Sequence, residues 1–383
     1  MKIALYTSRY DGSENIQNPP SLQYLAGCLI EKKLVDENNI LFANNIEQIK
    51  SFRPDILGIG SVSQCIRDAI RTAREIRAYL PFCWTILGGY HVSALPDCLP
   101  EVFDIGVVGE GELTFADIVM MRAQSNVIVP DVLKQIHGVC FRDANREIVR
   151  TQKRELLENI DSLTPFRRIP YGMEWPYLFT ARGCPFRCMY CASHSFWGKY
   201  RFHSAQYVVE QIRNLVEEHG ASSIYSVDDL FIAPKERLKE IRRLLHEKGL
   251  IGRVRFTGFV RVNMVDEEIL RILKEIGFVE IRFGMETASE RLLRQIKHKP
   301  FTVAQAESVI DLCNKIELPV CASFMFGIPG EDKEDIQASC RFLRKHKGRF
   351  RIAGFYLLQP VPGSELWETC MSKGLVSPEM DFS

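Results

Sequence analysis

The chain alternates short apolar segments with longer amphipathic ones, and it runs through this alternation twice. In the first half, the strand candidates are residues 2–7, 40–43, 56–61, 84–88 and 105–108. Helix candidates lie between them, and residues 64–80 follow the helical period of about 3.6 residues. Strands that alternate with helices over short connections form a parallel sheet covered on both faces. This half therefore predicts an α/β, doubly wound, Rossmann-like domain, which a strand or hairpin at residues 138–150 would close.

A second and longer alternation begins at Tyr177. Its strand candidates are residues 177–180, 223–227, 254–260, 279–285, 320–326 and 352–358. Ser204, Asp266 and the pair Thr302 and Gln305 are typical starts of the intervening helices. Six such units are too few to close an eight-stranded barrel, so we expect an open (β/α)6 partial TIM barrel with its site at the carboxyl ends of the strands.

The segment between the two alternations, residues 151–176, is charged and contains Pro165, Pro170 and Pro176. Such a segment is typical of a linker. The predicted domains are therefore residues 1–150 and 177–383.

Charge and hydropathy argue against two classes of partner. The 49 Lys and Arg residues balance 48 Asp and Glu residues, so the chain has no basic field that would attract nucleic acid. No apolar run approaches the roughly 18 residues of a spanning helix, and the first residues resemble a strand and not a signal peptide. We expect a cytoplasmic protein that binds neither nucleic acid nor membrane.

Of twelve cysteines, nine are scattered singly, mostly in apolar segments, where core packing in a reducing compartment explains them. The other three, Cys184, Cys188 and Cys191, form a C-x3-C-x2-C pattern directly after the first strand of the second half. Cysteine thiolates hold iron–sulfur clusters, and three ligands on one loop would leave one iron open for a ligand that is not protein. A zinc site is the alternative, and it would need His194 or another residue as a fourth ligand.

This segment resembles the signature of the radical S-adenosylmethionine superfamily, in which an aromatic residue, here Tyr190, precedes the last cysteine. The resemblance implies that S-adenosylmethionine chelates the open iron of a [4Fe–4S] cluster and is cleaved to a 5′-deoxyadenosyl radical. The cofactors supply this chemistry, while the protein positions and shields them. It also implies a small-molecule substrate and an electron donor such as flavodoxin or ferredoxin.

Further matches to this superfamily lie at the ends of the later strands. Asp228 and Asp229 could accept hydrogen bonds from the cofactor's ammonium group, although one of them could instead cap a helix. Arg261 could pair with the methionine carboxylate or form a surface ion pair. Glu286 resembles a glutamate that contacts the ribose hydroxyls. Gly327 resembles the adenine-side loop, where glycine lets the backbone approach the ring.

The first half resembles the cobalamin-binding domain that precedes many enzymes of this superfamily. The resemblance assigns cobalamin contacts to Ser61, Ser63, Gly88, Gly89, Gly109 and Glu110. Glycine at a strand end lets the backbone approach a large planar ligand, while a tight turn is the alternative for Gly88 and Gly89. The loop at residues 8–20 contains no histidine, so we expect cobalamin to bind without a lower histidine ligand and His91 to hydrogen-bond the backbone at its strand end.

The sequence therefore predicts a radical S-adenosylmethionine enzyme, with cobalamin-dependent methylation of a small metabolite or natural-product intermediate as the leading expectation. One alternative is a cyclisation, oxidation, dehydration or rearrangement without methyl transfer. Another is a non-catalytic sensor that binds the cofactors. Members of this class often continue well beyond the sixth strand, whereas this chain stops at Ser383, so we expect the segment that covers the barrel mouth to be absent or reduced.

Overall fold

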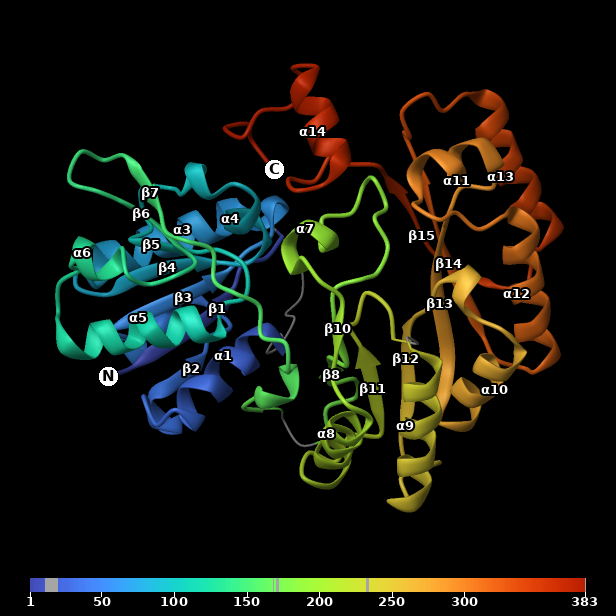
Figure 1. Ribbon diagram of the computed structural model, residues 1–383, viewed down its shortest axis with the longest axis horizontal. Coiled ribbons are helices and arrows are strands. Elements are labelled where there is room, and N and C mark those ends of the chain that lie inside the picture. The colour runs from blue at the N-terminus through green and yellow to red at the C-terminus, as the bar shows by residue number, and fades with distance from the viewer. Residues whose placement is uncertain (11–19, 168, 170–171, 232–233, 383) are drawn as a thin grey trace. The chain divides into compact units, whose positions relative to one another are not determined.

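The computed structural model describes residues 1–10, 20–167, 169, 172–231 and 234–382 (Figure 1). They form two compact units. The first comprises residues 1–168, 195–197 and 361–383, and the second comprises residues 169–194 and 198–360. Most of the loop expected to face cobalamin, residues 11–19, and Pro170 of the expected linker lie outside the described residues. The domain boundaries given by the sequence stay predictions.

The first unit is built on a seven-stranded sheet in the order β2-β1-β3-β4-β5-β6-β7. Its parallel strands are β1 (Ile3–Thr7), β2 (Ile40–Phe42), β3 (Ile56–Gly60), β4 (Trp84–Gly88) and β5 (Ile105–Val107). An antiparallel hairpin follows, consisting of β6 (Val139–Arg142) and β7 (Ile148–Arg150). The doubly wound prediction is confirmed, including the hairpin that closes it.

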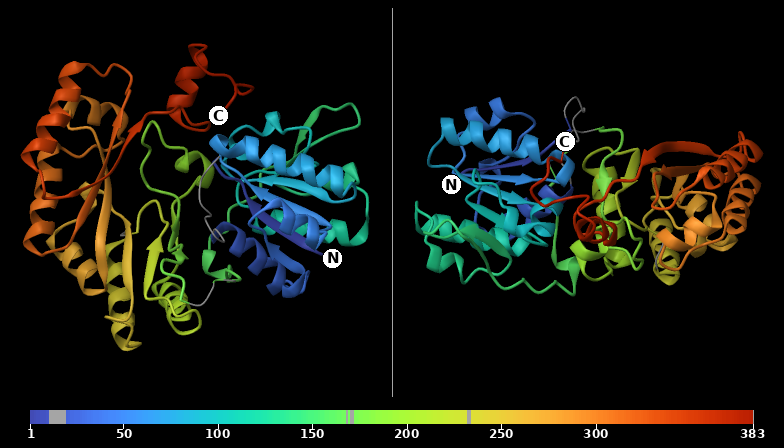
Figure 2. Two further views of the ribbon diagram at one scale, coloured as in Figure 1. Left: turned by 180° about the vertical axis from the view of Figure 1, so that it is seen from behind. Right: turned by 90° about the horizontal axis from the view of Figure 1, so that it is seen from above.

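Helices cover both faces of this sheet (Figure 2), because successive side chains of a strand point to opposite faces. On one face, Ile3 and Leu5 belong to a core with α1 (Pro20–Glu31) and α5 (Glu112–Gln124). On the other face, their neighbours in β1 pack with α2 (Ile46–Phe52) and α3 (Ile66–Tyr79). The short helices α4 (Tyr90–Ala94) and α6 (Pro130–Leu133) lie in the connections.

The carboxyl-terminal segment also packs in the first unit. Helix α14 (Glu365–Ser372) buries Trp367, whose ring stacks on Phe382 with a centroid separation of 5.9 Å. Phe382 in turn meets the ring of His91 edge-on at 5.4 Å. An ion pair joins Arg67 to Asp381. Residues far apart in the sequence therefore complete the packing around His91.

The second unit is an open sheet of six parallel strands in sequential order. The strands are β8 (Tyr177–Leu178), β11 (Ser223–Ser226), β12 (Arg255–Phe259), β13 (Phe278–Glu286), β14 (Val320–Phe326) and β15 (Arg351–Leu357). Because β8 and β15 are its two edges, the sheet does not close, as expected for a partial barrel. Two short antiparallel strands, β9 (Ala181–Arg182) and β10 (Arg201–Phe202), were not predicted.

The connecting helices are α8 (Ala205–Glu217), α9 (Lys235–Glu247), α10 (Glu267–Glu275), α11 (Glu290–Ile296), α12 (Val303–Lys315) and α13 (Lys333–Lys345). Ser204, Asp266 and Thr302 cap three of them as predicted, and Gln305 completes the capping box. Helix α11 was not predicted. Among the described residues, no helix combines the length and the apolar content that crossing a membrane would require.

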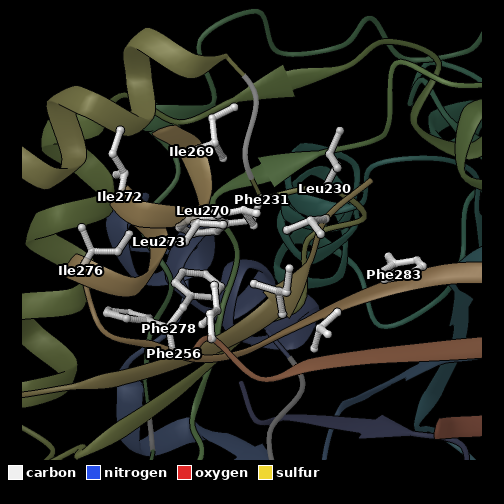
Figure 3. Close-up of a cluster of buried hydrophobic side chains, with 14 of the residues drawn as sticks. Leu230, Phe231, Phe256, Ile269, Leu270, Ile272, Leu273, Ile276, Phe278 and Phe283 are labelled. Atoms are coloured by element: carbon white, nitrogen blue, oxygen red, sulfur yellow. The ribbon is translucent and has the colours of Figure 1, made fainter. Parts of the chain in front are cut away.

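The core of the second unit lies between the sheet and these helices. Phe256 of β12 stacks on Phe278 of β13 with centroids 5.7 Å apart, and Leu273 of α10 and Ile276, which follows this helix, belong to the same cluster (Figure 3). Helix α10 presents apolar residues on one face, so it covers the sheet and leaves its charged residues outside. This packing holds the strands whose carboxyl ends carry the candidate site.

We predict that Gly27→Ala destabilises the first unit. A Cβ at position 27 would lie 1.8 Å from the backbone carbonyl oxygen of Thr164, so α1 would have to move away from that segment. The loss should be about 1–3 kcal/mol in the free energy of unfolding, measured by urea unfolding. The control is Gly60→Ala, whose Cβ would lie 3.9 Å from Leu22. Equal losses in the two variants would contradict the prediction.

Candidate active site

The three clustered cysteines lie on a loop that follows β9. Gly183 opens the loop with a φ of 83°, which glycine adopts without strain. Cys184, Cys188 and Cys191 follow, and the Cys191 N–H donates to the Cys188 carbonyl at 2.9 Å. The loop has no helix or strand until α7 (Ser193–Trp197) begins. Its shape therefore depends on contacts with neighbouring segments.

Two sulfur atoms of this loop accept hydrogen bonds from nitrogen donors. The backbone N–H of Ser193 lies 3.5 Å from Cys191 Sγ, and Arg261 Nη1 lies 3.4 Å from Cys188 Sγ. Such donors stabilise the negative charge of thiolate ligands, and hydrogen bonds to sulfur are a normal feature of iron–sulfur sites.

The third cysteine, Cys184, is partly buried. Burial raises the pKa of its thiol to about 11, against the lowering effect of a hydrogen bond from the backbone of Phe186. No three His, Cys, Asp or Glu side chains in the described part of the chain converge around a point where one metal ion could bind. A zinc site would need four such side chains around one ion. In a [4Fe–4S] cluster each thiolate binds a different iron, and the assignment of the three cysteines to such a cluster stays a prediction.

Asp228 lies at the end of β11 and is only 2% exposed. Its carboxylate accepts hydrogen bonds from the backbone N–H groups of Thr180 (2.6 Å) and Ala181 (3.0 Å), and also from the hydroxyls of Thr180 and Ser226. Burial raises the pKa of Asp228, which these donors oppose. The carboxylate therefore joins the connection after β8 to the end of β11, and its acceptor sites face protein.

Asp229, the next residue, has a different environment. It is exposed, and its carboxylate accepts a hydrogen bond from the Ser193 hydroxyl, two residues after the last cysteine. Of the two predicted carboxylates, Asp229 is thus the one beside the cysteine loop with exposed surface. Its contact with the cofactor's ammonium group stays a prediction.

Arg261, at the end of β12, is 9% exposed. Besides Cys188, it donates to Asn263 Oδ1 at 3.0 Å and to the carbonyls of His298 (3.0 Å) and Lys299 (2.9 Å). Among the described residues, Arg261 is therefore buried with these polar partners and does not form the surface ion pair considered from the sequence. The predicted contact with the methionine carboxylate remains untested.

Glu286 ends β13 with a φ of 63°, a strained value for this residue type. The register shifts between Gly284 and Glu286, and a Cβ at position 284 would lie 1.9 Å from Glu286 Oε1. Gly284 therefore leaves room for this side chain to fold back over the strand. The hydroxyl of Tyr190 donates to Glu286 Oε1 at 2.8 Å, and so does Lys297 Nζ at 3.2 Å.

Lys297 is a site residue that the sequence reasoning missed. It is 5% exposed, and its ammonium group also lies 3.2 Å from the Tyr190 hydroxyl. Its only signal in the sequence is its position at the end of the apolar segment that forms α11, where an exposed lysine is the ordinary expectation. The buried group of Tyr190, Glu286 and Lys297 joins the cysteine loop to β13 and α11.

Gly327 follows β14 with a φ of 80°, so this position favours glycine. Its N–H donates to Glu331 Oε2 at 2.6 Å, and the Glu331 N–H donates to the Ile328 carbonyl at 2.8 Å. In the part of the chain that the structure describes, no atom lies within 4 Å of a Cβ built at position 327. The loop is thus compact, with open space beside Gly327, and the predicted adenine contact stays a prediction.

In the first unit, Gly60, Gly88 and Gly109 form what we call the glycine edge, because they end or follow the adjacent strands β3, β4 and β5. Gly60 and Gly88 are register partners. Among the described residues, no atom lies within 4 Å of a Cβ built at position 88 or 109, and at position 60 the nearest is Leu22 at 3.9 Å. Packing within the part of the chain that the structure describes therefore does not require glycine at positions 60 and 88.

Gly89 is different, because a turn explains it. Its φ is 97°, and a Cβ there would lie 2.7 Å from the Ser61 carbonyl oxygen. The backbone N–H of Ser61 donates to the Gly88 carbonyl at 2.9 Å, so the two strand ends are held together. The tight-turn alternative applies to Gly89 and not to Gly88. Glu110 directly follows the edge, and its contact with cobalamin is untested.

His91 is buried at the same strand ends. Its Nδ1 lies 3.0 Å from the Ser63 hydroxyl, and its backbone N–H donates to the Ser61 carbonyl at 3.2 Å. Burial lowers the pKa of His91 to about 4, so the ring is neutral near pH 7. The His91 ring thus hydrogen-bonds at its strand end, but its partner is the Ser63 hydroxyl and not the backbone that the sequence suggested.

Comparison with known proteins bears on most of the chain. The Radical SAM superfamily model matches residues 178–343. An uncharacterized methyltransferase of Pyrococcus horikoshii is 30% identical over 379 residues, which cover 94% of this chain and 79% of that protein. Cytidylyl-2-hydroxyethylphosphonate methyltransferase of Streptomyces wedmorensis is 27% identical and covers 87% of this chain and 70% of that protein.

The fold is also similar to that of a solved structure. The radical S-adenosylmethionine methyltransferase TsrM from Kitasatospora setae, with cobalamin and a [4Fe–4S] cluster bound, aligns with a TM-score of 0.78 and 19% identity over 97% of this chain and 75% of that chain. The family match covers the cysteine loop, and the relative from P. horikoshii matches both units. The protein therefore belongs to the radical S-adenosylmethionine superfamily, whose enzymes use a [4Fe–4S] cluster and S-adenosylmethionine.

Proposed function

We propose that this protein is a cobalamin-dependent methyltransferase that acts on a small metabolite or natural-product intermediate. The observation that carries the proposal is the glycine edge of the first unit. Side chains at the ends of β3 and β4 would keep a flat ligand away from the sheet. Gly60 and Gly88 have no side chain at these positions, although packing among the described residues does not require glycine there. A doubly wound sheet binds its ligands at this carboxyl edge.

The similar proteins support this proposal through their own activities. Two relatives are methyltransferases by name, and the TsrM structure holds cobalamin. The finer statement for this chain, that it transfers a methyl group with the help of cobalamin, is our inference from these names and from the glycine edge. An electron donor such as flavodoxin or ferredoxin would reduce the cluster.

In the second unit, we propose that Cys184, Cys188 and Cys191 hold the cluster. When bound, the cluster and S-adenosylmethionine supply the radical chemistry. Asp229, beside the loop, would accept hydrogen bonds from the ammonium group of S-adenosylmethionine. Both donors to Glu286 in the described residues meet Oε1, so Oε2 would accept from the ribose hydroxyls.

The proposed reaction predicts a labelled product. S-adenosylmethionine with a deuterated methyl group, incubated anaerobically with cobalamin, reductant and candidate acceptors, should give an acceptor that carries the deuterated methyl group, together with S-adenosylhomocysteine. Mass spectrometry measures both. Formation of 5′-deoxyadenosine without methyl transfer would favour a cyclisation, oxidation, dehydration or rearrangement. If neither product forms while the cluster is intact, a sensor role would replace the enzyme.

Cobalamin binding should depend on the glycine edge. Gly88→Val places a branched side chain on the edge and should weaken binding tenfold or more, with Gly88→Ala in between, while the iron content stays unchanged. Electron paramagnetic resonance of Co(II) cobalamin measures the bound form. In the unmodified protein this spectrum should lack nitrogen superhyperfine splitting from a protein imidazole, because residues 8–20 contain no histidine and the His91 ring is buried against Phe382. Unchanged binding by the valine variant would remove the main support for cobalamin.

Glu286→Gln should weaken S-adenosylmethionine binding roughly tenfold to a hundredfold, the range expected for one charge-assisted hydrogen bond. The substitution also leaves Lys297 buried without its carboxylate, so the matched control is the double variant Glu286→Gln with Lys297→Met. Isothermal titration measures affinity, and iron analysis checks the cluster. If the double variant regains normal affinity, the role of Glu286 is limited to pairing with Lys297.

A further inference from the structure

The guanidinium group of Arg261 is in direct contact with a sulfur atom of the cysteine loop. Its Nη1 lies 3.4 Å from Cys188 Sγ. In the described residues, the donor to Cys191 Sγ is the neutral backbone N–H of Ser193. Arg261 therefore brings a full positive charge to Cys188 Sγ, whereas the Ser193 N–H brings only a peptide dipole to Cys191 Sγ.

This charge is held in place from several sides. Nε donates to Asn263, and Nη2 donates to the carbonyls of His298 and Lys299. The Phe186 ring, which lies on the cysteine loop itself, is stacked against the guanidinium with its centroid 3.8 Å from Cζ. A cation between an aromatic face and carbonyl oxygens gains electrostatic energy from both. Each guanidinium nitrogen thus has a partner, and the group cannot turn away without losing these contacts.

We propose that Arg261 is a positioning residue that raises the reduction potential of the cluster through Cys188. The inference rests on the three cysteines being the cluster ligands, as proposed above, and does not depend on cobalamin. Reduction adds one negative charge to a cluster and its thiolates. A fixed cation hydrogen-bonded to a ligand sulfur stabilises that reduced form more than the oxidised one, because hydrogen bonds and nearby charge set the potentials of such clusters.

The same contacts make Arg261 less suited to bind the methionine carboxylate. Bidentate pairing needs two parallel N–H groups on one edge of the guanidinium. In the described structure, Nε is turned to Asn263, Nη2 to two carbonyls and Nη1 to sulfur. A two-point contact with a carboxylate would require some of these bonds to break.

The test is an anaerobic redox titration of the reconstituted protein without S-adenosylmethionine, cobalamin or substrate, followed by electron paramagnetic resonance. Arg261→Gln should lower the equilibrium constant for one-electron reduction tenfold or more, which is a midpoint potential about 59 mV more negative. Arg242→Gln is the matched control, because it removes the same charge from a partly exposed pair with Glu275. Its potential should equal that of the unmodified protein.

Two outcomes would overturn the proposal. The first outcome is an Arg261→Gln variant that retains its iron and has an unchanged midpoint potential. If this variant also binds S-adenosylmethionine more weakly, Arg261 would be assigned to the methionine carboxylate of that cofactor. The second outcome is measured on the unmodified protein, so it tests the proposal even if Arg261→Gln loses its iron. With arginine labelled by ¹⁵N in the guanidinium group, pulsed electron paramagnetic resonance of the reduced cluster should detect a ¹⁵N coupling. The absence of this coupling would exclude the contact between Arg261 and the cluster ligand. The triple variant Cys184→Ala, Cys188→Ala and Cys191→Ala, which should lose the iron, tests the ligand assignment separately.

Discussion

The buried carboxylate of Asp228 is the interaction on which the geometry of the second unit's site depends. A carboxyl group at 2% exposure is tolerated only if hydrogen-bonding groups surround it, and here the donors come from Thr180, Ala181 and Ser226. These residues lie where the chain leaves β8 and where β11 ends. Arg237 secures the opposite side of the same connection by donating to the Thr180 carbonyl at 2.6 Å. The start of the cysteine loop is thereby fixed relative to the sheet.

The rest of the cysteine loop is held by packing and by single hydrogen bonds. Its Met189 N–H donates to the Ile296 carbonyl at 2.9 Å, and Met189 and Tyr190 pack on a small apolar cluster that includes Leu292 and Ile328. With the Arg261 contact, the loop is joined to β12, α11 and the loop after β14. A change in any of these segments therefore reaches the cysteines through one or two contacts, although none of the segments carries a cysteine ligand.

Local patterns predicted the elements well where local forces decide them. The strands Trp84–Gly88 and Val320–Phe326 and the cap at Thr302 depend on neighbouring residues in the sequence, and the sequence identified them. The two-residue strands β9 and β10 and the short helix α11 have too few residues to show a period. The sequence also could not separate Asp228 from Asp229, since which of two adjacent carboxylates is buried depends on Thr180, far along the chain. For the same reason, it missed Lys297, whose partner Glu286 is set by tertiary contact.

The return of the carboxyl-terminal segment to the first unit affects when that unit can finish folding. His91 leaves the ribosome long before Trp367 and Phe382, which pack around it. The entropy of closing so long a loop grows only slowly with its length, so the stability of the finished unit suffers little. The timing is different, because domains otherwise tend to fold in the order of synthesis. During translation the sheet of the first unit can form, but the face around His91 stays incomplete until the whole second unit has been made, and in that interval chaperones have access to it.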